Sequence, residues 1–67
     1  MWYLYICDRN GQLYTGITTD LDHRMVQHKA KLLYSETFDN KFDAAKRERE
    51  IKGWSRKKKD ALVESRR

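Results

Sequence analysis

The chain has 67 residues, 37% of them charged and 39% hydrophobic, which predicts one small domain with a thin core. Its single cysteine excludes an intramolecular disulfide and a cysteine-rich zinc site. No apolar run is long enough to cross a bilayer, and the first residues lack the basic region of a signal peptide. We therefore expect a cytoplasmic protein without membrane contact, whose eight aromatic residues supply a compact core.

The positive charge is concentrated in the last third of the chain. Residues 1–45 carry five basic and six acidic side chains, whereas residues 46–67 carry ten basic and four acidic ones. A basic segment of this kind favours a polyanionic partner, most often nucleic acid. The alternative is that these lysines and arginines only keep a helical surface soluble.

The sequence predicts two strands, a helix, a third strand and two further helices, an α+β fold of the order ββαβαα. Asn10-Gly11 is a strong signal for a two-residue hairpin turn, because both residue types tolerate positive φ angles. Capping residues stand where each helix would begin, and Gly53 stands where the second helix would stop. The predicted strands cover residues 2–8, 12–18 and 32–38, and the predicted helices cover residues 21–29, 41–52 and 56–64.

The hairpin turn also predicts a register. With a two-residue loop, Tyr5 pairs with Gly16 and Cys7 pairs with Tyr14, so both tyrosines project from the same side of the sheet. The tyrosines could simply fill the core of an aromatic-rich hairpin. Gly16 favours a functional interpretation, because a glycine in a strand leaves space for the close approach of a backbone or a substrate.

One face of the predicted first helix carries both apolar and basic residues. Helical spacing places four residues on it: Leu21, Arg24, Met25 and His28. Leu21 and Met25 would form the buried stripe, with Arg24 and His28 beside it. Arg24 either extends along this apolar stripe or reaches over the sheet to a phosphate. His28 alone is more often a surface or half-buried histidine than a catalyst.

The predicted second helix places a carboxylate, that of Glu48, on its apolar face. Glu48 shares a face with Ala44 and Ile51, where an unpaired charge is unfavourable, whereas Glu50 points to the opposite side as a solvated charge. Two interpretations are open for Glu48. It forms a salt bridge with Arg24, or it is a metal ligand in a site shared with the tyrosines.

These segments together resemble the signature of the GIY-YIG nuclease superfamily. Residues 3–6 read Tyr-Leu-Tyr-Ile, and residues 13–28 begin with Leu-Tyr-Thr-Gly-Ile and include Arg24 and His28. Residues 42–52, followed by Ser55-Arg56, resemble the glutamate-bearing helix of the small bacterial single-domain branch. The resemblance covers nearly all of residues 1–67 as one domain. Relative to that branch, the hairpin is one residue shorter, and only residues 29–31 stand in place of a longer Gly-rich, basic segment.

The resemblance implies a three-stranded antiparallel sheet flanked by helices, and an endonuclease that hydrolyses phosphodiester bonds with Mg²⁺ or Mn²⁺ as cofactor. It implies catalytic roles for Tyr5, Tyr14, Arg24, His28 and Glu48, with Glu48 as the metal ligand. Arg24 would balance the negative charge of the transition state. Tyr5, close to a metal and a guanidinium, would lose its proton more readily than a free tyrosine and relay a proton from the attacking water. Tyr14 would orient water or phosphate, and His28 could assist as a base.

DNA is the partner that the resemblance and the basic segment together favour. Contacts with its phosphates are predicted for Arg24, Lys52, Arg56, Lys57, Lys58 and Lys59. Such contacts give affinity without reading the base sequence. The alternative function is a non-catalytic nucleic-acid-binding module, in which the tyrosine, arginine and glutamate cluster belongs only to the core. A small protein-interaction domain is a third, more distant interpretation.

Overall fold

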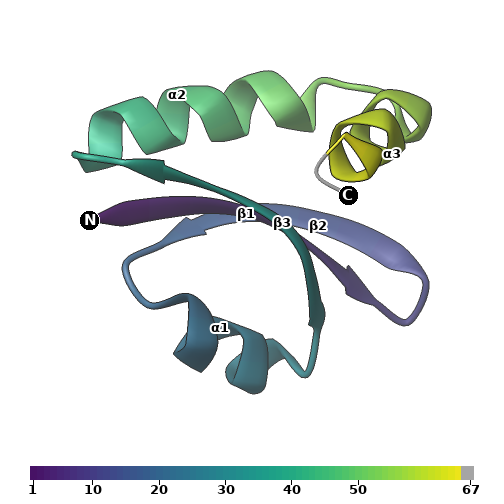
Figure 1. The fold of residues 1–67 in the computed structure, drawn as a ribbon, viewed down its shortest axis with the longest axis horizontal. Helices are drawn as coiled ribbons and strands as arrows, with labels where there is room; N and C mark the ends of the chain where they lie inside the picture. Colours follow the sequence, from purple (N-terminus) through teal and green to yellow (C-terminus); the bar gives the residue numbers. More distant parts are fainter. Residues whose placement is uncertain (66–67) are drawn as a thin grey trace.

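The computed structural model describes residues 1–65 and confirms the predicted α+β fold and its element order (Figure 1). Three of the predicted elements have the predicted bounds, and the other three differ by one residue at one end. The elements are β1 (Trp2–Arg9), β2 (Gln12–Thr18), α1 (Leu21–His28), β3 (Lys31–Phe38), α2 (Lys41–Lys52) and α3 (Arg56–Glu64). No helix among the described residues is long and apolar enough to cross a membrane.

The hairpin turn is formed as predicted. Asn10 and Gly11 both have positive φ angles, 55° and 83°, which is the geometry of a primed two-residue turn. The Gly11 amide donates a hydrogen bond to Oδ1 of Asp8 at 2.9 Å, and this bond closes the loop. The predicted register is confirmed, since Tyr5 pairs with Gly16 and Cys7 pairs with Tyr14.

The three strands form one antiparallel sheet in the order β2-β1-β3. In Figure 1, α2 and α3 cover one face of this sheet and α1 lies on the other face. Successive residues of a strand point to opposite faces. Because β1 is central and covered on both sides, all of its residues from Leu4 to Cys7 are buried.

The main core lies between the sheet and the α2–α3 layer. Its fully or largely buried members are Leu4, Ile6, Tyr34, Ile51 and Val63. The expectation that the eight aromatic residues supply the core is wrong for some of them. Among the aromatics only Tyr5 and Tyr34 are buried, while Tyr14 and Phe42 are exposed. Aliphatic side chains supply most of the burial because β1 and α2 both present them to this layer.

Helix α1 turns the predicted face towards the sheet, but the residues of this face are less buried than expected. Its four half-buried residues are the four predicted ones, Leu21, Arg24, Met25 and His28. None of the helix is fully buried, because eight residues cover only part of the sheet. Asp20 caps the start by accepting a hydrogen bond from the His23 amide, and Lys29 ends the helix with a φ of 51°. Only Lys29 and Ala30 separate α1 from β3.

Helices α2 and α3 begin at capping residues in the predicted segments. Asn40 accepts a hydrogen bond from the Asp43 amide, and Ser55 accepts one from the Lys58 amide. Helix α2 ends at Gly53, as predicted, but this glycine has a right-handed φ of −79°. The stop therefore does not depend on the left-handed conformation for which glycine is usually selected.

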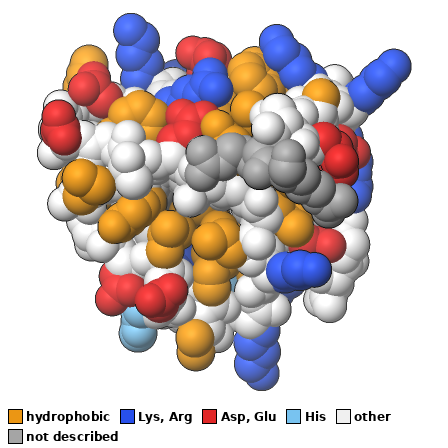
Figure 2. All heavy atoms as spheres, viewed as in Figure 1, with side chains coloured by type: hydrophobic (Ala, Val, Ile, Leu, Met, Phe, Trp, Pro, Cys, Tyr) orange, Lys and Arg blue, Asp and Glu red, His pale blue; other side chains and the backbone are white. Residues whose placement is uncertain are grey.

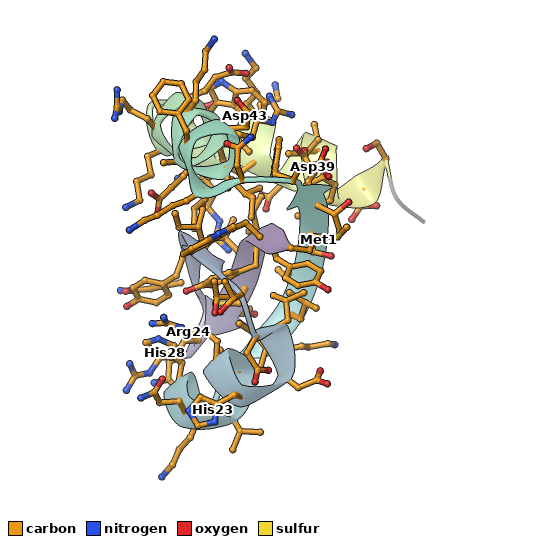
Figure 3. All side chains as sticks on the ribbon, turned by 90° about the vertical axis from the view of Figure 1, so that its left-hand side faces the viewer. Met1, His23, Arg24, His28, Asp39 and Asp43 are labelled. Atoms are coloured by element: carbon orange, nitrogen blue, oxygen red, sulfur yellow. The ribbon has the colours of Figure 1, made fainter. Side chains whose placement is uncertain are left out.

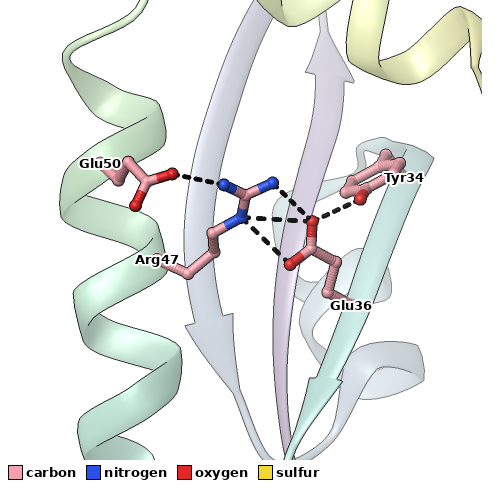
Figure 4. A network of polar contacts seen from close by, with 4 residues as sticks. All are labelled: Tyr34, Glu36, Arg47 and Glu50. Atoms are coloured by element: carbon pink, nitrogen blue, oxygen red, sulfur yellow. Dashed lines mark hydrogen bonds and ion pairs between the residues drawn. The ribbon is translucent and has the colours of Figure 1, made fainter.

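A polar network that the sequence did not predict joins α2 to β3 (Figure 4). Arg47 donates from Nε to Oε1 of Glu36 at 3.1 Å and from Nη2 to Oε2 at 3.1 Å, and Glu36 also accepts from the Tyr34 hydroxyl. Arg47 binds Glu50 as well, while the Glu50 side chain stays about half exposed, so it is a solvated charge as predicted and has a partner on the same helix. Cζ of the Arg47 guanidinium also lies 5.3 Å from the centre of the Trp54 ring. This network fixes the rotation of α2 against the sheet.

Candidate functional site

Tyr5 lies at the centre of the predicted site and depends on Gly16. A Cβ atom added to Gly16 would be 2.5 Å from the Tyr5 hydroxyl oxygen and 2.7 Å from its Cζ. The Tyr5 side chain thus takes the space that Gly16 leaves on the neighbouring strand. The expected approach of a substrate at Gly16 stays a prediction, and in this structure the glycine makes room for Tyr5.

Two predicted charges act on the Tyr5 hydroxyl from opposite layers. Burial raises the pKa of Tyr5, Arg24 of α1 lowers it, and Cys7 and Glu48 raise it further. The structure therefore places Arg24 and Glu48 within electrostatic reach of the Tyr5 hydroxyl. Without a bound metal, burial outweighs the effect of Arg24 on the pKa of Tyr5, and the expected easier loss of the proton beside a metal stays a prediction.

Glu48 is half-buried on α2, and its ion-pair partner differs from the predicted one. Its Oε2 lies 3.4 Å from Nζ of Lys52, one helical turn further along. The alternative of a Glu48–Arg24 salt bridge is wrong, because no side-chain ion pair or hydrogen bond engages Arg24 within residues 1–65. Figure 3 shows Arg24 beside His28 on one side of α1. The Arg24 guanidinium is available for an anion.

A half-open cavity of about 190 Å³ adjoins Tyr5 on the α1 face of the sheet. Its lining combines residues of the hairpin with the end of α1 and the connection to β3: Tyr5, Cys7, Arg9, Tyr14, Thr15, His28 and Ala30. Tyr5, Tyr14 and His28 were predicted as site residues, whereas Cys7 and Arg9 were missed. Strand alternation could have found them, since residues 5, 7 and 9 of β1 share a face.

Glu48 is the carboxylate that could hold a divalent cation here. Among the described residues, no group of three histidine, cysteine, aspartate or glutamate side chains is placed to enclose a metal ion. Mg²⁺ and Mn²⁺ are hard cations, and Mg²⁺ commonly keeps several waters and uses one or two protein carboxylates. The donor chemistry fits such an ion, because a carboxylate is a hard oxygen ligand and the charge of Glu48 acts on the Tyr5 hydroxyl. Lys52 would have to release the carboxylate.

The predicted phosphate-binding cations occupy different environments. Nη1 of Arg56 donates to the Gly11 carbonyl at 3.0 Å, and Nζ of Lys58 lies 4.3 Å from the centre of the Trp54 ring. Lys52 is paired with Glu48, whereas the side chains of Lys57 and Lys59 have no polar partner within residues 1–65. Basic side chains project from the α2–α3 layer, with acidic ones among them (Figure 2). Helix α3 and the cavity lie on opposite faces of the sheet.

Comparisons with known proteins identify the family of this chain. A family model described as the GIY-YIG catalytic domain matches residues 1–32. A UPF0213 protein of Staphylococcus saprophyticus is 39% identical, and the match covers 91% of this chain and 92% of the relative. The chain belongs to the UPF0213 family. A UPF0213 protein of Haloquadratum walsbyi is 37% identical, with 92% of this chain and 85% of that protein covered.

The UPF0213 family also provides a similar solved structure. The solution structure of a UPF0213 protein from Bacillus halodurans has a TM-score of 0.68 and 34% identity, and covers 96% of this chain and 84% of that one. This chain is therefore a small GIY-YIG-type protein, and a GIY-YIG domain is a nuclease-like domain.

The UPF0213 relatives carry residues that this chain lacks. The match to the Staphylococcus saprophyticus protein spans 75 aligned positions, more than the 67 residues of this chain. The GIY-YIG model match ends at Leu32, the second residue of β3. The longer alignment agrees with a connection between α1 and β3 that is shorter than in relatives of this type.

Proposed function

We propose that this chain is an endonuclease that hydrolyses phosphodiester bonds in DNA with Mg²⁺ or Mn²⁺ held by Glu48. The observation that supports this proposal is the convergence of three groups from three elements. The hydroxyl of Tyr5 on β1 is acted on by the positive charge of Arg24 on α1 and by the negative charge of Glu48 on α2. A cation, a carboxylate and a phenol around one point are suited to a phosphate group.

Arg24 and Glu48 have separate roles in this proposal. Glu48 would hold the cation together with water molecules, and Lys52 would turn to solvent or to a phosphate. When bound, a divalent cation polarises a phosphate oxygen and stabilises charge on the leaving oxygen. Arg24, whose guanidinium has no polar partner among the described residues, would bind phosphate oxygens through its planar fork and balance the additional transition-state charge.

The tyrosines and His28 would position and move protons. The raised pKa of Tyr5 keeps its hydroxyl protonated at neutral pH, so Tyr5 would donate a hydrogen bond and pass its own proton to a solvent water as it accepts one from the attacking water. The Tyr14 hydroxyl donates to Oε1 of Gln12 at 3.0 Å, which holds Tyr14 ready to orient water or phosphate. His28 lines the same cavity as Tyr5 and would assist as the base.

A non-catalytic nucleic-acid-binding module is the second candidate function. The ion pair between Glu48 and Lys52 favours it, because this pair occupies the carboxylate that a cation would need. In that case the basic residues of α2 and α3 would bind phosphates, and the cluster around Tyr5 would be structural.

The deciding experiment compares cleavage and binding in matched variants. Branched, single-stranded and duplex DNA are incubated with Mn²⁺ and wild type, Glu48→Gln, Arg24→Ala or Glu50→Gln. Glu50→Gln is the control, because it removes the same charge from the opposite side of α2 and leaves the Arg47–Glu36 bonds intact. We expect Glu48→Gln and Arg24→Ala to lose cleavage and retain binding, and Glu50→Gln to cleave normally.

Two outcomes contradict the proposal in different ways. Full cleavage by Glu48→Gln would refute the metal role, because an amide holds a hard cation far less well than a carboxylate. A wild-type protein that binds DNA and never cuts it would establish the binding module instead.

A further inference from the structure

The cavity beside Tyr5 has the lining of a site for a planar aromatic ligand. Its lining includes two aromatic residues, Tyr5 and Tyr14, together with Cys7 and His28. Cys7 and Tyr5 are buried, so the part of the lining that they form is shielded from solvent. A nucleobase would find an aromatic ring to stack on in this cavity.

Tyr14 is placed to be the stacking partner. Tyr14 is 46% exposed although it lines the cavity, so a ligand in the cavity can reach it from solvent. The hydrogen bond from its hydroxyl to Gln12 restrains the ring before any ligand arrives. A restrained aromatic side chain binds with a smaller loss of conformational entropy than a mobile one.

Polar groups at the same cavity are available for the edge of a base. Within residues 1–65, no side-chain hydrogen bond or ion pair engages Arg9 or His28. A guanidinium is a donor, and an imidazole can donate or accept, so the pair suits the mixed edge of a nucleobase. Ala30, the last residue of the short connection before β3, is a small residue at this cavity.

Tyr5 connects this cavity to the phosphate site. Its ring lines the cavity, while its hydroxyl is the atom on which Arg24 and Glu48 act. We propose that the cavity binds the nucleobase of a nucleotide whose phosphate lies against Arg24 and Tyr5, with the base stacked on Tyr14. This inference rests on the proposed function, because it takes the phosphate position from it.

The test measures binding of small ligands without cleavage. Wild-type protein is titrated in EDTA with dAMP, dTMP and deoxyribose 5-phosphate, and binding is followed by NMR shifts of the Cys7 and Ala30 amides. We expect both nucleotides to shift these amides and to bind more tightly than the sugar phosphate that lacks a base. Tyr14→Leu removes the ring on which the base would stack. We expect this variant to bind dAMP roughly 5- to 150-fold more weakly than wild type.

Two further variants separate stacking from folding. Tyr14→Phe keeps the ring and should bind dAMP nearly as well as wild type. Tyr3→Leu is the matched control, because Tyr3 lies on the same face of β1 but lines a different hollow beside the start of α1, and it should leave binding unchanged. Equal affinity for dAMP and deoxyribose 5-phosphate, or unchanged binding by Tyr14→Leu, would overturn the base site.

Failure of this inference can be told apart from failure of the proposed hydrolysis. If wild type and Glu48→Gln both bind dAMP at the cavity but wild type never cleaves DNA, the base site stands and the hydrolysis proposal is wrong. If wild type cleaves DNA and Tyr14→Leu binds all three ligands like wild type, the hydrolysis stands and the base site is wrong.

Discussion

Replacing Gly16 with alanine tests the central contact of the site. The added Cβ would lie 2.5 Å from the Tyr5 hydroxyl oxygen and 2.7 Å from Cζ, about 1 Å inside ordinary contact. The aromatic ring must shift, because one of these atoms belongs to the rigid ring. Overpacking of this kind costs about 1–3 kcal/mol, and the lower backbone entropy of alanine offsets about 0.5–1 kcal/mol. We expect a net loss of about 1–2 kcal/mol in the free energy of unfolding.

Urea and thermal denaturation followed by circular dichroism measure this loss. A destabilisation of 1 kcal/mol lowers Tm by roughly 4–8 °C in a domain of this size. Gly53→Ala is the matched control, since its nearest neighbour would be the Glu50 carbonyl oxygen at 3.5 Å and its φ is helical. We expect Gly53→Ala to be neutral or slightly stabilising. A Gly16→Ala protein as stable as wild type would show that Tyr5 does not depend on this space.

Three further predictions concern the network, the buried phenol and the basic surface. Glu36→Gln weakens the charge-assisted hydrogen bonds with Arg47, and both side chains are only about a quarter exposed or less. We expect the free energy of unfolding, measured by urea titration, to fall by about 1–2 kcal/mol. An unchanged free energy of unfolding would refute the role of this network. The pKa of Tyr5 is raised in the folded state, so its contribution to stability is full below the pKa of an unfolded tyrosine and is lost as the pH rises above it. Denaturation between pH 8 and pH 11 should therefore show a smaller alkaline loss in Tyr5→Phe than in wild type, and equal losses would contradict the raised pKa. Fluorescence anisotropy measures the slope of log affinity for duplex DNA against log salt concentration, and Lys57→Ala should reduce this slope by about 0.9. Arg56→Ala should instead remove the hydrogen bond to the Gly11 carbonyl in the hairpin turn. A wild-type affinity that does not change with salt would exclude phosphate binding.

The local features of this fold could be predicted because short sequence signals determine them. Asn10-Gly11 fixes a two-residue turn, and the turn fixes the register that places Tyr5 against Gly16. Helical spacing alone predicted which four residues of α1 face the sheet. These inferences need only the geometry of one turn or one helix.

The long-range pairings could not be predicted, because the sequence does not say which charges meet across the fold. Glu48 has an inward position on α2, but its partner is Lys52 on the same helix and not Arg24 on the opposite layer. The bond between Arg47 and Glu36 joins residues from different elements, and neither carries a local pattern that marks the other. Phe42 looked like a core residue by type, yet its position on α2 turns it to solvent.

The order of the strands has a consequence for how the sheet assembles. β1 pairs with both neighbours, whereas β2 and β3 do not pair with each other. The contacts of β1 with β2 are local and close over a two-residue turn, so they can form early and at low entropic cost. Pairing with β3 requires closure of a longer loop that contains α1. A chain without β3 would still keep a hairpin, whereas a chain without β1 would leave two strands that have no partner.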